Sequence, residues 1–376
     1  MNKKWLIALL VFMLILLGGI YYLYFFLTVR ITEPYSMDFI TLQPGYAIDI
    51  FADDLGPQKV SIPGPNNGVR MLEYSDGVFY ASVPGKGEIV ALFDKNNDWK
   101  IEKRTTFISG LLRPHGIAVH EDYVYIAAED QVVRVKDTDK DGIAEMETLE
   151  KLVDLPPGTH WTRTVKIFDD TMYISIGSTC NVCREEHPWR AAIVQCELDG
   201  SNCGVFASGL RNAVDMEFHD GKIWATENGR DLVNNELPPD EINIIKEGKN
   251  YGWPICYGKN IHDTDFDKNV YVDDPCKFGV MESSIIDLQA HSAPIGLAFY
   301  DDDLLVAYHG SWNRNPLTGY KIVTIDLKTE QVEDFASGWL AEDGTVRGRP
   351  TDILIKDGSI LVTDDVAGVI YRIYQK

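Results

Sequence analysis

Histidine, arginine and asparagine side chains recur at one position of a repeated sequence pattern. Imidazoles exchange protons near neutral pH, and guanidinium groups bind carboxylates through paired hydrogen bonds. Gathered in one place, such side chains could remove a proton from one molecule while holding an anionic partner beside it. The residues concerned are Arg70, His115, His160, Arg163, Arg211, Asn212, His291 and Arg349.

Each of these residues lies at or near the start of one of six similar segments, in which two short apolar runs flank an Asp-containing turn. The turn acids are Asp76, Asp122, Asp170, Asp220, Asp302 and Asp357. Their spacing is 46 to 55 residues, except for one interval of 82. A period of this size, built from paired short strands, is typical of propeller blades. The sequence therefore predicts an all-β, six-bladed β-propeller whose first strands line a central channel and bring the polar residues to one end of it.

The composition agrees with one large β domain behind a membrane anchor. Runs of Val, Ile, Tyr, Phe and Thr alternate with Gly, Asp and Asn, which is strand-and-turn chemistry. We expect an anchor at residues 1–30, a linker at 31–45 and the propeller at 46–376, with an insertion from about Asn234 to Asp287 in the long interval. The net charge of -22 argues against a nucleic-acid partner, because phosphate binding needs a basic surface.

The N-terminal segment indicates in which cellular compartment the propeller lies. Trp5 to Val29 forms 25 residues without a charge, preceded by Lys3 and Lys4. This length can span a bilayer, and the lysines favour an N-terminus inside the cell. The alternative is a cleavable signal peptide, but the apolar run exceeds a signal core and no small-residue cleavage site follows. We expect a single-pass protein of the cell membrane with its propeller outside the cytoplasm.

The six cysteines fit an oxidising compartment. The residues are Cys180, Cys183, Cys196, Cys203, Cys256 and Cys276, an even set for which spacing alone allows 15 connectivities. The intervals favour Cys196 with Cys203 and Cys256 with Cys276. Cys180 and Cys183 could form a third disulfide, or a metal-binding or redox pair, although the sequence contains no second CxxC.

Two acidic loops resemble calcium-binding loops. DTDKDGIAE, from Asp137, has side-chain oxygens at positions one, three and five and Gly at position six, whereas DKNNDWKIE, from Asp94, lacks the Gly. Thr148 stands where an EF-hand has its bidentate Glu at position twelve. The pattern indicates surface connections between strands, with weak calcium affinity at most, rather than an EF-hand.

Longer motifs resemble those of the glucose/sorbosone dehydrogenases. The motifs are GLRNAVDMEF with ATENGRD, DEINIIKEGKNYGWP, GSWNRNPLTGYKI and RGRPTDILIKDGSILVTDDVAGVIYRI, and YISIGSTCNVC is similar to the sorbosone dehydrogenase branch in particular. The likeness runs from about Gly68 to Tyr374. It implies a six-bladed quinoprotein that oxidises an aldose or sugar aldehyde by hydride transfer to pyrroloquinoline quinone, and passes electrons to a membrane quinone or a soluble carrier.

The resemblance also implies roles for individual residues. His160 matches the family's catalytic base, although Arg163 follows after two residues where the family has three. Arg211 and Asn212 match a pair beside the reactive carbonyl, so Arg211 is expected to act in catalysis as well as in cofactor binding. The other cofactor contacts implied are Arg314, Arg347 and Arg349, with Lys321 near Arg314.

The remaining implied contacts concern calcium and the sugar. The family holds calcium through backbone carbonyls at a Gly-Pro dipeptide, and Gly229 and Arg230 occupy that place here. His115, Trp161 and His291 are candidates for the substrate rim, with core packing as the alternative for each. Glu227, Asp231, Asp240 and Glu241 are interpreted as acids that order loops.

Two other classes of function remain open at this stage. A lactonase-like propeller hydrolase would need calcium ringed by acidic side chains from several blades, whereas the first strands here begin with His and Arg. A propeller that binds a glycan or a protein without catalysis is also compatible, because fold does not determine function.

Overall fold

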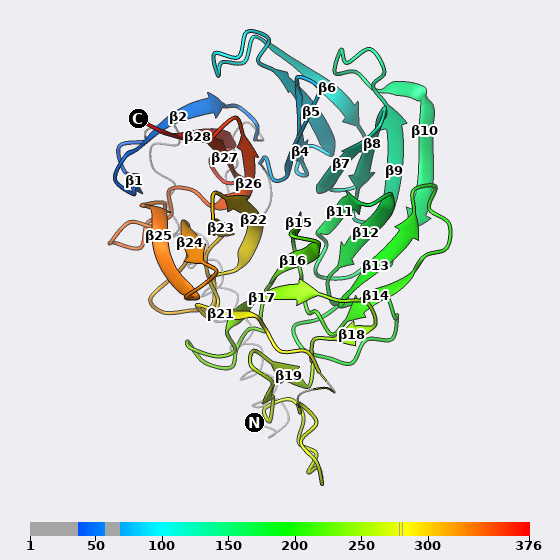
Figure 1. Cartoon of the computed structure of the whole chain (residues 1–376), viewed down its shortest axis with the longest axis vertical. Coiled ribbons are helices and arrows are strands. Elements are labelled where there is room, and N and C mark those ends of the chain that lie inside the picture. Colours follow the sequence, from blue (N-terminus) through cyan, green and yellow to red (C-terminus); the bar gives the residue numbers. More distant parts are fainter. Residues whose placement is uncertain (1–36, 57–67, 278, 280) are drawn as a thin grey trace, which may run out of the picture.

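The computed structural model describes residues 37–56, 68–277, 279 and 281–376. Within these ranges the regular elements are β-strands, which form six twisted sheets around a central axis and one small two-stranded sheet outside them (Figure 1). The predicted all-β six-bladed propeller is confirmed. The predicted membrane anchor lies outside the described residues, and among those described no helix is long and apolar enough to cross a membrane.

The first three blades follow one another along the chain, each with consecutive antiparallel strands. Blade one consists of β3 (Leu72–Ser75), β4 (Val78–Val83), β5 (Glu88–Phe93) and β6 (Lys103–Ser109). Blade two consists of β7 (Gly116–His120), β8 (Tyr123–Ala127), β9 (Gln131–Lys136) and β10 (Glu145–Asp154). Blade three consists of β11 (Arg163–Phe168), β12 (Thr171–Ile176), β13 (Ala192–Glu197) and β14 (Gly204–Ser208), with β18 (Lys249–Asn250) parallel at its edge.

The last three blades include strands from distant parts of the chain. Blade four consists of β15 (Met216–His219), β16 (Lys222–Glu227), β17 (Asp240–Ile245) and β21 (Ile286–Leu288). Blade five consists of β22 (Pro294–Tyr300), β23 (Asp303–Tyr308), β24 (Lys321–Asp326) and β25 (Gln331–Ser337), with β1 (Thr41–Leu42) at its edge. Blade six consists of β26 (Pro350–Lys356), β27 (Ser359–Asp364), β28 (Val369–Gln375) and β2 (Tyr46–Ala52).

The chain closes its own ring. Strand β2, from the N-terminal side, pairs antiparallel with the C-terminal strand β28. One blade therefore joins both ends of the propeller, which removes an open seam between the first and last blades. Strand β1 lies within the predicted linker, so part of that segment is packed against blade five.

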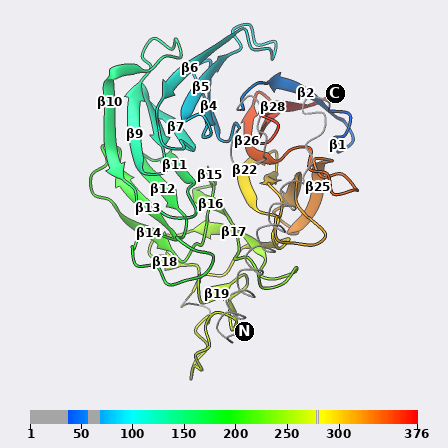
Figure 2. The same cartoon turned by 180° about the vertical axis from the view of Figure 1, so that it is seen from behind.

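The insertion is shorter than the sequence indicated. The prediction placed its start near Asn234, but Asp240–Ile245 is the third strand of blade four. The added segment covers residues 246–285, includes the small hairpin of β19 (Cys256–Tyr257) and β20 (Ile261–His262), and projects from the rim of the disk (Figures 1 and 2). The error arose because the Asp- and Pro-rich connection before β17 has the composition of a loop.

The acidic turns join the first two strands in every blade, as predicted. Asp76, Asp220 and Asp357 have positive φ and are each followed by a Gly with positive φ. Two such residues form the tight hairpin turn whose twist matches the strands. Facing blades then bury their apolar side chains between them, as Tyr80 and Ile126 do between blades one and two.

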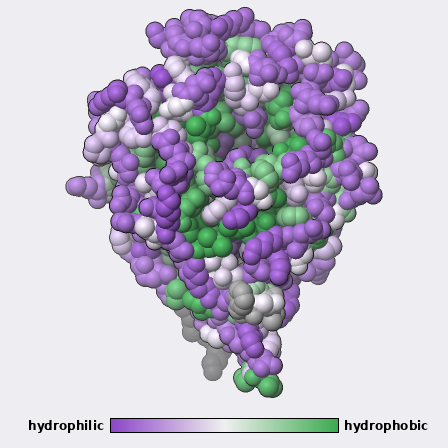
Figure 3. Space-filling model, in the orientation of Figure 1, coloured by the Kyte–Doolittle hydropathy of each residue, from purple (hydrophilic) through white to green (hydrophobic). Residues whose placement is uncertain are grey.

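The first strands β3, β7, β11, β15, β22 and β26 lie next to one another around the centre (Figure 1). All are paired antiparallel with the second strand of their blade. The residues before a first strand and the residues after a second strand therefore meet at the same end of the channel. We call this end the entrance; Figure 3 shows a hollow near the middle of one face of the disk.

Candidate functional site

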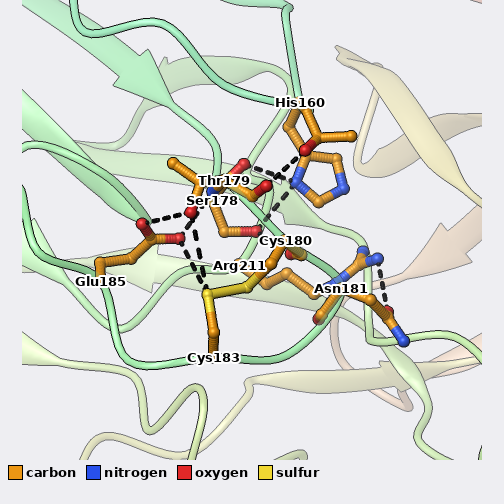
Figure 4. The surroundings of a disulfide bond; sticks show 9 residues. His160, Ser178, Thr179, Cys180, Asn181, Cys183, Glu185 and Arg211 are labelled. Atoms are coloured by element: carbon orange, nitrogen blue, oxygen red, sulfur yellow. Dashed lines mark hydrogen bonds between the residues drawn. A yellow bond between two sulfur atoms is a disulfide. The ribbon is translucent and has the colours of Figure 1, made fainter.

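His160, just before β11, is held by one neighbour at the entrance. Its Nδ1 lies 3.0 Å from the carbonyl oxygen of Ser178 and 2.9 Å from Ser178 Oγ. Figure 4 shows the other ring nitrogen on the side away from Ser178. Burial, followed by the positive charge of Arg211, lowers the pKa of His160 to about 3. The imidazole is therefore neutral at pH 7, and the same burial and charge make it a weaker base than a free imidazole.

Ser178 was not singled out from the sequence. It follows β12, and its amide donates a 2.7 Å hydrogen bond to the carbonyl of Arg211 in the next blade. Its hydroxyl donates to the carbonyl of Cys180 at 2.6 Å. The Cys180–Cys183 disulfide closes this loop, and all three disulfides considered from the sequence are formed. Ser178 thus joins the His160 ring, the disulfide loop and blade four in one rigid unit (Figure 4).

Arg211 and Asn212 lie beside His160, before β15. The Arg211 guanidinium donates to Asp231 at 3.0 Å and to the Asn181 carbonyl at 2.9 Å. Asn212 Oδ1 is buried without a hydrogen-bond partner. A Cβ on Gly177 would lie 2.3 Å from Asn212 Oδ1 and 2.7 Å from His160 Cβ. Glycine at this position therefore lets the base candidate and the amide approach each other.

The two predicted carboxylate-binding arginines of the RGRP motif separate in space. Arg349 donates from Nε to the His309 carbonyl at 2.9 Å and from Nη2 to the Gly310 carbonyl at 2.6 Å. Both partners are neutral, so these contacts orient the guanidinium without neutralising its charge. Arg347 instead lies over the ring of Phe39, with its guanidinium carbon 5.2 Å from the ring centroid.

Arg314 and His291 both bind the segment between β16 and β17. Arg314 donates to the Asn235 carbonyl at 2.6 Å and to Glu236 at 2.8 Å. His291 Nε2 lies 2.7 Å from the Asn234 carbonyl oxygen. In this arrangement they order a loop near the entrance. Lys321, which the resemblance placed near Arg314, pairs with Asp334 at 2.5 Å on blade five.

His115 and Trp161 lie just before β7 and β11, at the entrance, and pack against each other. Their ring centroids are 5.6 Å apart in an edge-to-face contact, and His115 is completely buried. The guanidinium carbons of Arg70 and Arg113 lie 5.5 and 5.2 Å from the Trp161 ring. Burial and then the charge of Arg70 hold the pKa of His115 well below its ordinary value. His115 Nε2 is buried without a hydrogen-bond partner, and the role of both residues at the substrate rim stays a prediction.

The predicted calcium position adjoins a small cavity. Gly229 and Arg230 line a space of ≈ 20 Å³ together with Glu227 and Glu241, which is about the room of one water molecule. The Arg230 guanidinium, a cation that cannot act as a metal ligand, is paired with Asp263 at 2.5 and 2.8 Å. Burial, then the neighbouring Glu241, raises the pKa of Glu227 well above its ordinary value, and Glu227 Oε2 has no hydrogen-bond partner. Both oxygens of Glu241 accept hydrogen bonds, from Gly258 and Asn243, so Glu227 Oε2 is the carboxylate oxygen in this space that could bind a cation.

The entrance also contains a buried network of charged residues that was not predicted from the sequence. Asp365, after β27, lies 2.6 Å from Arg70 Nη1 and 3.0 Å from His309 Nε2. Burial opposes ionisation of Asp365, yet His309 and Arg70 hold its pKa far below the usual range. Burial, then the charge of Arg349, lowers the pKa of His309 to about 4. These residues could have been found from the sequence. The antiparallel hairpin of each blade brings the end of the second strand to the entrance, and His309, Ser178 and Asp365 each follow the end of a second strand.

A cluster of one lysine and four acids lies on or next to the inner strands, further into the channel. Lys166 Nζ lies 3.7 Å from Asp215 and 3.7 Å from Glu217, and the carboxyl groups of Glu73 and Asp352 lie around it. Burial alone would lower the pKa of Lys166, but the carboxylates raise it above its ordinary value. Burial raises the pKa values of Glu73 and Asp352 to about 7. An ammonium group thus stands among acids contributed by three blades.

Comparison with known proteins identifies the family. Residues 75–357 match the family described as TrAA12-like, so the chain belongs to this family. An uncharacterized protein of Borreliella burgdorferi is 33% identical over 320 residues, covering 77% of this chain and 82% of that protein. A pyrroloquinoline quinone-dependent pyranose dehydrogenase of Coprinopsis cinerea is 29% identical over 215 residues, covering 44% of this chain and 30% of that enzyme.

Solved structures share the fold. The iodide structure of a Trichoderma reesei AA12 enzyme superposes with a TM-score of 0.77 at 18% identity, covering 93% of this chain and all of that one (100%). The holo pyranose dehydrogenase PQQ domain from Coprinopsis cinerea gives a TM-score of 0.75 at 19% identity, with coverages of 92% and 98%. An aldose sugar dehydrogenase from Streptomyces coelicolor gives 0.63 at 16% identity, with coverages of 89% and 100%.

Proposed function

We propose that the protein is a quinoprotein dehydrogenase that oxidises an aldose or a related sugar aldehyde by hydride transfer to pyrroloquinoline quinone. The single observation that carries the proposal is the His160 arrangement: a neutral imidazole held through Nδ1 by Ser178, next to the charged Arg211 and the unpartnered Asn212 Oδ1. Membership of the TrAA12-like family, and similarity to a pyrroloquinoline quinone-dependent dehydrogenase, support this reading.

The residues at the entrance fit the proposed cofactor. Pyrroloquinoline quinone carries carboxylates and a quinone, so its site needs oriented cationic donors. Arg349 is oriented by two neutral carbonyls and keeps its charge, and Asn212 Oδ1 is a buried acceptor that lacks a donor. When bound, the cofactor supplies the hydride acceptor.

The chain supplies the proton chemistry and the electrostatics. His160 Nε2 accepts the proton of the sugar hydroxyl, because Nδ1 is engaged with Ser178 and the ring is neutral. Arg211 is fixed by Asp231 and Asn181 so that its charge favours negative charge developing beside it. Calcium, if bound here, would be held by Glu227 together with the backbone of Gly229 and Arg230, and would supply positive charge beside the cofactor.

We also propose that the protein is anchored in the cell membrane, with its propeller outside the cytoplasm. Three disulfides suit an oxidising compartment, and the uncharged segment from Trp5 to Val29 suits a single membrane span. The electron acceptor would be a membrane quinone or a soluble carrier. Deleting residues 1–32 should release a folded, soluble domain. An aggregated product would count against a single terminal anchor.

Reconstitution of the purified protein with the cofactor and calcium tests the activity. A panel of aldoses and sugar aldehydes is offered together with a dye acceptor, and the rate of dye reduction is measured. Turnover with at least one sugar is expected. A parent protein that binds no cofactor would instead support a binding propeller without catalysis. The lactonase alternative is disfavoured because Lys166 occupies the centre of the acids in the channel, where a hydrolytic calcium would need to bind.

A further inference from the structure

The two acidic loops on the rim differ in one respect that bears on metal binding. The loop at residues 94–102 joins β5 to β6, and the loop at residues 137–145 joins β9 to β10. Position six of each loop has positive φ, at Trp99 (65°) and at Gly142 (77°). Both loops therefore have a residue in the left-handed conformation at position six. They differ in the hydrogen bonds that their side-chain oxygens accept.

In the loop at residues 94–102, backbone amides of the same loop donate hydrogen bonds to the buried acid. Asp94 Oδ1 accepts the amide of Asp98 at 3.0 Å, and Asp94 Oδ2 accepts the amide of Trp99 at 2.8 Å. Both oxygens of the only largely buried acid in this loop therefore have a donor. The Glu102 carboxylate is also bonded within the loop, because it accepts a hydrogen bond from the amide of Lys95.

The second loop leaves a buried oxygen without a donor. Asp137 is completely buried, its Oδ2 accepts the phenol of Tyr80 at 2.5 Å, and its Oδ1 has no hydrogen-bond partner. Carboxylate oxygens of Asp137, Asp139 and Asp141 come within 4.8 Å of one another. A buried carboxylate oxygen without a donor costs free energy unless a cation or a proton compensates it.

The nearby cations do not compensate Asp137. Lys103 donates to the backbone carbonyl of Asp141 at 2.7 Å, and Lys140 lies 3.7 Å from Asp76 in blade one. Glu145 closes the loop by accepting the amide of Thr138 at 2.9 Å. The three aspartates thus face one another as an all-oxygen set at positions one, three and five, which is the chemistry that Ca²⁺ prefers.

We propose that the loop at residues 137–145 is a structural Ca²⁺ site, separate from the entrance, and that the loop at residues 94–102 is not. The site would link two blades, because Tyr80 and Thr105 of blade one bond to Asp137 and to the Gly142 carbonyl of blade two. A Cβ on Gly142 would lie 2.6 Å from the Phe93 ring, so the loop is seated closely on blade one. Ca²⁺ bound here stabilises the contact between blades one and two.

The test uses the full chain, calcium alone and no quinone cofactor. Asp139→Asn keeps an oxygen that can accept the Asp141 amide, as Asp139 Oδ1 does now at 3.2 Å, but removes one charged ligand. Asp98→Asn is the matched control in the other loop, where Asp98 likewise accepts a backbone amide, from Lys100 at 3.0 Å. Ions bound per chain are counted by equilibrium dialysis, and the melting temperature is measured with and without about 5 mM Ca²⁺, above the weakest affinities usual for such loops.

We expect the parent and Asp98→Asn to bind the same number of ions and to melt at a higher temperature with Ca²⁺. Asp139→Asn should bind one ion fewer, or bind it at least ~10-fold more weakly, and lose most of the rise in melting temperature. The proposal is overturned if the parent binds no Ca²⁺, if Asp139→Asn keeps both the parental count and the parental rise, or if Asp98→Asn shows the same loss as Asp139→Asn. A folding defect is separable, because each variant is compared with itself in the absence of Ca²⁺.

Discussion

The entrance and the interior of the channel use charge in opposite ways. In the interior, one ammonium group, that of Lys166, faces four carboxyl groups, those of Asp215, Glu217, Glu73 and Asp352, so acids outnumber the cation. At the entrance, the guanidinium of Arg349 donates its hydrogen bonds to neutral carbonyls and lies over the Tyr320 ring, and Asn212 Oδ1 has no donor. The excess of acids around Lys166 makes this lysine important for the stability of the fold, whereas the oriented Arg349 and the unpartnered Asn212 Oδ1 can bind a ligand. The same six inner strands provide both.

The largest effect is expected from the proton acceptor at the entrance. His160→Ala should lower turnover by ~10²–10⁴-fold with little change in cofactor affinity, because the base is lost while the arginine contacts remain. His187→Ala, an exposed histidine in the loop after β12, is the matched control. Sugar-dependent dye reduction and cofactor titration are measured for both. Full turnover in His160→Ala would refute the assignment and make His115 or His291 the next candidate.

In the interior the expected effect is on stability. Lys166→Met should lower the free energy of unfolding by roughly 3 kcal/mol, because it leaves Asp215 buried without its counter-charge. Lys166→Arg keeps the charge and should recover much of the loss. Chemical denaturation near pH 7 gives the comparison. If Lys166→Met is as stable as the parent, the cluster is not the source of stability that we infer.

Arg349→Met should separate binding from chemistry at the entrance. Loss of a charge-assisted carboxylate contact should weaken cofactor binding by ~1.5–3 kcal/mol, and excess cofactor should restore much of the activity. Arg104→Met, on β6 at the rim, is the control, because Arg104 bonds only to backbone carbonyls far from the entrance. Unchanged affinity in Arg349→Met would place the carboxylate contacts elsewhere.

The smallest effect is expected from the residue that positions the base. Ser178→Ala removes the Oγ contact to His160 Nδ1 but keeps the carbonyl contact at 3.0 Å. Turnover should fall by about 3–10-fold, the value of one neutral hydrogen bond. Because a contact that accepts from Nδ1 favours the protonated ring, its loss should move the acid limb of the pH–rate profile to lower pH. A lower rate with an unmoved profile would indicate a general structural defect instead.

Acid stability gives a further check on His160. Its pKa is about 3 in the folded protein, below the ordinary value of 6.5. Between these two pH values His160 is protonated in the unfolded chain but neutral in the folded chain. The free energy of unfolding therefore has its full value above pH 6.5 and decreases as the pH falls toward 3. Relative to His160→Asn, the parent should lose ~2 kcal/mol between pH 6.5 and pH 4.5. Parallel stability curves for the two proteins would contradict the lowered pKa.

The sequence by itself determined the repeated part of the molecule. Hairpin turns at residues such as Asp76, Asp220 and Asp357 depend on local backbone preference, so their spacing revealed six blades and placed His160, Arg211 and Arg349 before inner strands. The three disulfides also agreed with local spacing. These features depend on neighbours within one blade, which is why the pattern was sufficient to predict them.

Only the tertiary structure decided which side chains meet. Ser178 holds His160 from the end of a second strand, and Asp365 joins Arg70 across 295 residues of chain. Arg347 and Arg349 are two residues apart but point to different surroundings, and Asp94 and Asp137 head similar loops while only Asp137 keeps a buried oxygen without a donor. Partner choice depends on how six sheets close into a ring, and a sequence period specifies the repeat without specifying the contacts between blades.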